Sequence, residues 1–163
     1  MDQIKKIDGT DRDILNILRE NARTPNVDIA RRIGIAPSTV HERIRKLEQR
    51  GIIKGYETRL GDKDLGLGLT TFILIRTEER VGVTAIGETL AKLPQVIESH
   101  FVAGQYAYLL KVRVADTDAL KELLKQFGEI EGVIDTRTTL VLSTLKETLS
   151  VGWDSEPEPT QYT

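Results

Sequence analysis

Residues 30–47 read ARRIGIAPSTVHERIRKL, and this stretch decides how the N-terminal part of the chain folds. Ala30 is small enough to sit where two helices touch. Gly34 allows the sharp turn between them, because glycine adopts backbone conformations that other residues avoid, and Ile35 can fill the space below the turn. Two short helices joined by such a turn predict a helix-turn-helix.

A helix is expected downstream of this turn, from Pro37 to about Arg50. Proline is favoured in the first helical turn, and Gly51 is a typical stop. Apolar residues at spacings of three and four predict its buried face, which leaves polar and charged side chains on the others. Such a helix fits the major groove of DNA, where its side chains meet base edges and phosphates. The candidate DNA-binding residues are Ser38, Thr39, His41, Glu42, Arg43, Arg45, Lys46, Arg50 and Lys54.

Among these, Arg43 and Glu42 are the expected base readers, and the other cations are expected on the phosphate backbone. A solvated helix face explains the same residues without any DNA. Two shorter helices are expected upstream, over residues 11–20 and from a cap at Asn26 to Ile33. Residues 52–58 alternate weakly, which predicts a short strand or wing.

Charge is divided unevenly along the chain although the net charge is only −2. Residues 1–60 hold 13 basic and 9 acidic side chains, and the remainder holds 10 basic and 16 acidic ones. A polyanion is therefore expected to be attracted to the N-terminal part.

The remaining chain predicts strands and helices in the order strand, helix, strand, strand, helix, strand. Alternation and helical spacing place them at residues 69–77, 83–93, 96–102, 106–114, 117–127 and 133–145. This order predicts an α+β architecture, a ferredoxin-like βαββαβ domain with its helices on one face of an antiparallel sheet. The other face then needs a cover, which oligomerisation can supply.

The expected organisation is a helix-turn-helix domain over 1–60, a linker over 61–68 and the βαββαβ domain over 69–148. Residues 149–163, with two prolines among polar neighbours, are expected to be a disordered tail. The chain has no cysteine and only two histidines, which argues against disulfides and metal sites. No nucleophile-and-base set, phosphate loop or long apolar run stands out, so we expect a cytoplasmic protein with no catalytic residues, cofactor or metal.

The sequence resembles the Lrp/AsnC (leucine-responsive and asparagine regulator) family over roughly residues 8–148. The resemblance is carried by several stretches taken together: Asp11-Arg12-Asp13-Ile14-Leu15, residues 33–40, residues 43–48, Gly51-Ile52-Ile53-Lys54-Gly55-Tyr56, Val102-Ala103-Gly104, Tyr108-Leu109-Leu110-Lys111 and Thr136-Arg137-Thr138. It implies a winged helix-turn-helix joined to an ACT-like (RAM) domain, in a transcription regulator that binds double-stranded DNA.

The resemblance also implies homodimers that assemble into octamers or larger rings, and an amino acid or related metabolite bound between dimers. The implied effector residues are Gly104, Gln105, Tyr106, Ala107, Tyr108, Thr136 and Thr138. The loop departs from the family pattern Gly-Asp-x-Asp-Tyr, since Gln105 and Ala107 replace the aspartates that could pair with an α-ammonium group. A plain hairpin turn explains the loop equally well.

Two alternatives remain open at this stage. The domain combination also resembles the siroheme decarboxylases, which use basic and histidine side chains around a tetrapyrrole, and His100 is the histidine available in the second domain. A metabolite sensor without DNA binding is the other alternative. The basic cluster on and after helix 37–50 favours the DNA-binding regulator over both.

Overall fold

The computed structural model describes residues 7–150 and 152, and these form two compact units. Within that part of the chain, residues up to Thr58 and from Glu147 onward belong to the first unit, and Arg59–Lys146 to the second. The expected tail lies outside the described residues from position 151 on, apart from residue 152. None of the described helices has the length and apolar character needed to span a bilayer.

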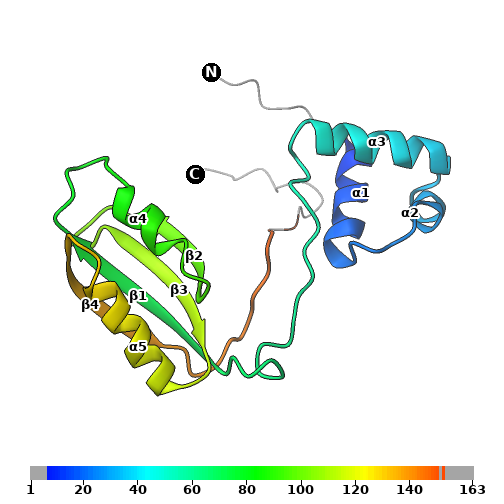
Figure 1. The fold of residues 1–163 in the computed structure, drawn as a ribbon. Helices are drawn as coiled ribbons and strands as arrows, with labels where there is room; N and C mark the ends of the chain where they lie inside the picture. The colour runs from blue at the N-terminus through cyan, green and yellow to red at the C-terminus, as the bar shows by residue number, and fades with distance from the viewer. Residues whose placement is uncertain (1–6, 151, 153–163) are drawn as a thin grey trace, which may run out of the picture. The chain divides into compact units, whose positions relative to one another are not determined.

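The first unit is built from three helices: α1 (Gly9–Glu20), α2 (Asn26–Ile33) and α3 (Pro37–Gln49) (Figure 1). They pack around a small buried cluster of Ile14, Ile29, Ala30 and Val40. The bounds of α3 agree with the sequence prediction, including Pro37 in the first turn. Asn26 was wrongly expected as the cap of α2, because the capping position is Pro25, whose carbonyl accepts from the amides of Asp28 and Ile29.

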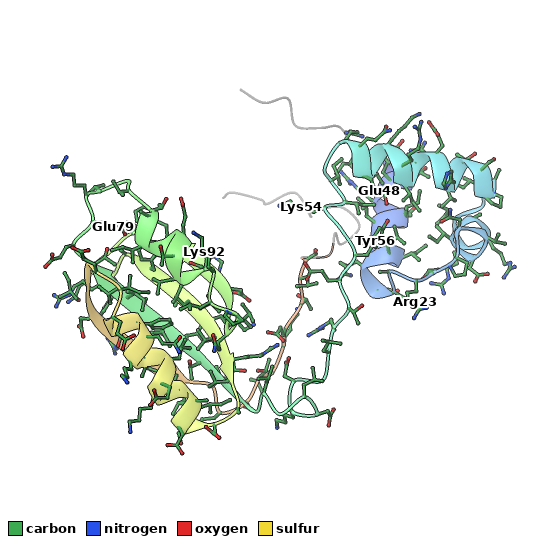
Figure 2. All side chains as sticks on the ribbon, in the orientation of Figure 1. Arg23, Glu48, Lys54, Tyr56, Glu79 and Lys92 are labelled. Carbon is green, nitrogen blue, oxygen red and sulfur yellow. The ribbon has the colours of Figure 1, made fainter. Side chains whose placement is uncertain are left out.

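No strand forms at residues 52–58, so the expected short strand is wrong. The amides of Ile52 and Ile53 both donate to the carbonyl of Leu47, which folds the chain back over the end of α3. Farther on, the hydroxyl of Tyr56 donates to Glu48 Oε1 at 2.9 Å (Figure 2). This segment is therefore tied to α3 by side-chain and turn hydrogen bonds.

The second unit has the predicted βαββαβ order. Its elements are β1 (Leu69–Thr77), α4 (Ala85–Leu90), β2 (Val96–Phe101), β3 (Tyr108–Val114), α5 (Thr117–Gly128) and β4 (Val133–Leu140). The strands form one antiparallel sheet in the order β2-β3-β1-β4, with α4 and α5 on one face (Figure 1). The predicted α+β, ferredoxin-like class and the β2–β3 hairpin are confirmed.

Every second residue of β1 and β3 enters the core beneath the two helices. Ile73 and Ile75 of β1 pack there with Leu110 and Val112 of β3 and with Phe127 of α5. The alternate side chains point to the opposite side, which we call the open face: it carries Phe72 and Leu74 on β1, paired with Lys111 and Leu109 on β3. Phe72 is 36% exposed there.

Two elements, α4 and β4, are shorter than predicted by five residues each. The helix expected over 83–93 is α4, Ala85–Leu90, because Gly82 (φ 87°) makes a turn before it and Leu90 is followed by turns rather than helix. The last strand stops at Leu140 instead of 145. Its last pairing with β1 is that of Leu140 with Thr71, and one backbone hydrogen bond follows, from the amide of Val141 to the carbonyl of Thr70.

Candidate nucleic-acid interface

The turn between α2 and α3 is made by backbone geometry that only a few residues tolerate. Gly34 is in the left-handed region (φ 74°), and its amide donates to the carbonyl of Ala30 at 2.9 Å. The amide of Ile35 donates to the same carbonyl at 3.1 Å, which closes the end of α2. The chain is thereby redirected into α3 within three residues.

The orientation of α3 follows from its buried face. Val40 and Leu47 are buried, and Ile44 packs against the same cluster as Val40. Ser38, Thr39, His41, Arg45 and Lys46 are exposed, whereas Glu42, Arg43 and Arg50 are half-buried. Lys54, after the helix, is exposed.

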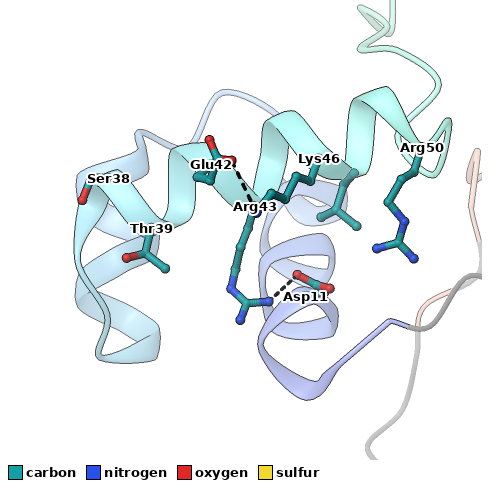
Figure 3. Close-up of a pocket in the computed structure, with 8 residues that line it drawn as sticks. Asp11, Ser38, Thr39, Glu42, Arg43, Lys46 and Arg50 are labelled. Atoms are coloured by element: carbon teal, nitrogen blue, oxygen red, sulfur yellow. Dashed lines mark hydrogen bonds and ion pairs between the residues drawn. The ribbon is translucent and has the colours of Figure 1, made fainter.

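A pocket of about 450 Å³ lies along one side of α3 and reaches the start of α1 (Figure 3). Six of the sequence-predicted DNA-binding residues line it, together with Leu47 and Asp11 of α1: these are Ser38, Thr39, Glu42, Arg43, Lys46 and Arg50. The structure thus brings these six together. His41, Arg45 and Lys54 lie outside that lining.

On α3, the carboxylate of Glu42 forms ion pairs with two neighbouring cations. Glu42 Oε1 lies 3.0 Å from Arg45 Nη2 and 3.4 Å from Lys46 Nζ. Hydrogen bonds from Arg45 and Lys46 lower the pKa of Glu42, and the pKa of Arg45 is raised by its bond to Glu42. This triad of Glu42, Arg45 and Lys46 carries one net positive charge, and its cations can exchange Glu42 for a phosphate at little cost in water.

Arg43 is placed differently from the other cations of α3. Its Nη1 lies 2.7 Å from Asp8 Oδ2 and 2.8 Å from Asp11 Oδ1, so its guanidinium bridges α3 to the beginning of α1. The hydrogen bonds that Arg43 donates to these two carboxylates raise its pKa. Neither partner was predicted from the sequence, since both lie more than thirty residues before Arg43.

The candidate effector residues fall at two places in the second unit. Gly104 (φ 136°) lies in the turn between β2 and β3, and Tyr108 begins β3. Tyr108 and Thr136 are both paired with Ile75, one on each side of β1, and Thr138 is opposite Ile73. Within one chain the turn and the two threonines therefore stand two strands apart, about 10 Å.

The side chain of Tyr108 is buried, and its hydroxyl donates to Glu79 Oε2 at 2.6 Å. The other oxygen of Glu79 accepts from the amide of Ile86 at 2.8 Å. Burial, followed by the hydrogen bond to Glu79, raises the pKa of Tyr108 to about 12. Glu79 had no sequence signal, since it is one of several charged residues in a loop.

His100 lies on β2, where its Nε2 is 3.3 Å from Glu98 Oε2 and both side chains are about half exposed. Lys111 reaches the other oxygen of Glu98 at 3.2 Å. Within the described part of the chain, no group of three or more histidine or carboxylate side chains is arranged to hold a metal ion. His100 thus belongs to a side-chain cluster with Glu98 and Lys111 on the open face.

Comparison with known families gives a match for each unit. Residues 7–54 match the family described as winged helix-turn-helix DNA-binding, and residues 70–151 match the Lrp/AsnC ligand binding domain. The two matches together account for most of the chain.

Individual relatives match over nearly their whole length. An uncharacterized HTH-type transcriptional regulator of Pyrococcus furiosus is 39% identical over 144 residues, which cover 86% of this chain and 96% of the relative. The leucine-responsive regulatory protein of Escherichia coli K12 is 36% identical, over 88% of this chain and 89% of its own. The structure of a Neisseria meningitidis transcriptional regulator in complex with L-Met superposes with a TM-score of 0.84 at 30% identity, covering 90% and 96% of the two chains.

Proposed function

This chain belongs to the Lrp/AsnC family of DNA-binding transcription regulators, and from that premise we propose that its α3 reads the major groove. The observation that carries the proposal is the row of polar and cationic side chains along α3, which the Gly34 turn holds away from the helical core. In this assignment Thr39 and Glu42 reach base edges, and Lys46, Arg45 and Lys54 contact phosphates. Such a regulator acts where the chromosome lies, so the cytoplasm is its proposed location.

We also propose that the protein works as a dimer joined through the second unit, with further assembly to octamers or larger rings. The open face supports this proposal, because Phe72, Leu74 and Leu109 are apolar side chains that the chain's own helices do not cover. A two-fold dimer presents two copies of α3 to successive half-sites on one side of the duplex.

An amino acid is the proposed effector, and no enzymatic activity is proposed. The support is the match to the family's ligand binding domain and the L-Met complex of the Neisseria relative. The turn at residues 104–107, Tyr108, Thr136 and Thr138 are the proposed contacts. Because β1 separates the turn from the two threonines, we place the ligand between subunits, where one chain's turn can meet another chain's threonines.

The test compares binding of the purified protein to its own upstream region and to a random duplex of the same length, over a salt series. We expect a preference of about a thousandfold or more for the upstream fragment that survives physiological salt. Amino acids are then screened for a shift in that affinity. Equal affinity for both duplexes, collapsing as salt rises, would contradict the proposal and leave only a basic surface.

Lys54→Ala serves as the internal comparison. Its side chain is exposed and lies after α3, so it is proposed to touch phosphate alone. The variant should lose affinity for both duplexes by the same factor, and the slope of log affinity against log salt should fall by about one.

A further inference from the structure

The contact between Arg43 and the start of α1 sets this arginine apart from the surface cations of α3. An α-helix turns 100° per residue, so a residue lies close to its neighbours three before and four after. For Arg43 these neighbours are Val40 and Leu47, which are both buried. Arg43 therefore leaves α3 on the edge of its packed face, toward α1, and not at the centre of its exposed face.

Both carboxylates that receive Arg43 are themselves held in place. Asp8 caps α1, since its Oδ1 accepts from the amide of Asp11 at 2.8 Å while its Oδ2 accepts from Arg43. These two hydrogen bonds, the one from the Asp11 amide first, lower the pKa of Asp8. Asp11 is buried, with its side chain 10% exposed. Figure 3 shows the Arg43 side chain directed at Asp11, while Thr39 and Lys46 project from α3 without reaching α1.

This geometry makes Arg43 a poor candidate for a group that moves onto DNA. To reach a base or phosphate, the guanidinium would have to give up two charge-assisted hydrogen bonds. Its departure would also leave the buried Asp11 without its cation, and an unpaired buried charge is costly. The cluster of one guanidinium and two carboxylates is net negative, so it does not attract phosphate.

We infer that Arg43 is a positioning residue, whose bridge to Asp8 and Asp11 fixes the rotation of α3 about its own axis relative to α1. The bridge thereby holds Thr39, Glu42 and Lys46 in the orientation in which they read DNA. This inference rests on the proposed function, and it replaces the expectation that Arg43 itself reads a base.

A double-mutant cycle tests it, using Arg43→Ala, Asp11→Asn and the pair combined in the full-length protein. The readout is the discrimination ratio, meaning affinity for the upstream fragment divided by affinity for a random duplex, at a temperature where circular dichroism shows every variant folded. Each single change should lower this ratio about tenfold, as a misplaced base contact does, and the combined change should lower it no further. The salt slope should stay as in the wild type.

Three results would each overturn the inference. If Arg43 reads a base, Arg43→Ala lowers the ratio but Asp11→Asn does not. If Arg43 touches phosphate, Arg43→Ala weakens both duplexes equally and the salt slope falls by about one. If the bridge only stabilises the fold, melting temperatures fall and the ratio is unchanged.

Two further variants complete the experiment. Should Asp11→Asn prevent folding, Asp8→Asn replaces it, because asparagine still caps a helix while the charge facing Arg43 is lost; a smaller drop in the ratio is expected. Arg31→Ala is the matched control, since Arg31 pairs with Asp28 at 3.1 Å on α2 and is 75% exposed; it should leave the ratio unchanged. A wild-type protein without any preference would refute the proposed function itself, and a discrimination ratio that Asp11→Asn leaves at its wild-type value would refute this inference alone.

Discussion

Tyr108 connects the loop after β1 to the first turn of α4. Its ring lies in the core, and its hydroxyl holds Glu79, which in turn accepts the backbone amide of Ile86 at the beginning of α4. One side chain of β3 thus fastens both the loop after β1 and the first turn of α4. Both carboxylate oxygens of Glu79 therefore accept a hydrogen bond.

Replacing Tyr108 by phenylalanine should lower the free energy of unfolding by about 2 kcal/mol, the value of a hydrogen bond to a charged group. The raised pKa of Tyr108, about 12, means that its stabilising contribution is complete below the ordinary value of 10.0 and is lost as pH rises through about 12. In an absorbance titration of tyrosine ionisation, the variant should lack one group that titrates near pH 12. Tyr106→Phe is the control, because the Tyr106 hydroxyl makes no hydrogen bond to other described residues; an equal loss in both variants would contradict the argument.

At the scale of elements, α4 can approach the sheet only because it contains Gly87. A Cβ placed on Gly87 would overlap the ring of Tyr108, and the residue is buried. The helix has six residues, so it has few other contacts with which to compensate. The close approach of α4 to β3 therefore requires that residue 87 has no side chain.

Gly87→Ala should destabilise the second unit by about 1–3 kcal/mol, the usual cost of overpacking, despite the better helix propensity of alanine. Gly128→Ala, at the end of α5, is the matched control because nothing lies within 4 Å of its added Cβ. It should be neutral or stabilising by up to about 1 kcal/mol. Thermal melts of both variants check this, and an unchanged Gly87→Ala protein would show that α4 shifts without cost.

Elements whose residues decide their own conformation could be predicted from sequence. The bounds of β1 agree with its richness in Thr, Ile and Phe, and those of α3 with Pro37 and the turn at Gly51. The end of β4 could not be predicted from its β-branched residues, because the length of a strand depends on its pairing, and β4 pairs with β1 as far as Leu140.

The candidate site was predictable to the level of a helix face. The sequence pattern predicted the six side chains that line the pocket beside α3. It did not predict that Arg43 forms ion pairs with two carboxylates of the same unit. That fact depends on Asp8 and Asp11, which are more than thirty residues away in sequence. The helical position of Arg43 next to Val40 and Leu47 was the available clue.

On the scale of the whole molecule, the proposed dimer depends on the open face. Phe72→Asp places a charge at the centre of that face, opposite Lys111, and should convert the oligomer to monomers in light scattering. Affinity for the upstream fragment should then fall by about a hundredfold, because two tethered half-site contacts become independent, while low-salt binding to random duplex changes little. Val81→Asp, at a fully exposed loop position, should leave the dimer intact. A dimeric, folded Phe72→Asp protein would place the subunit contact elsewhere.

The strand order β2-β3-β1-β4 has a consequence for engineering. β1 opens the sheet after the linker and β4 closes it, and they are adjacent, antiparallel neighbours: Thr71 is paired with Leu140. The second unit therefore enters and leaves at points one strand spacing apart, about 5 Å. Closely spaced ends are what an insertable cassette requires. Residues 69–141 could therefore be inserted into a surface loop of an unrelated carrier protein whose loop ends lie close together, which would give that carrier the βαββαβ unit with its open face.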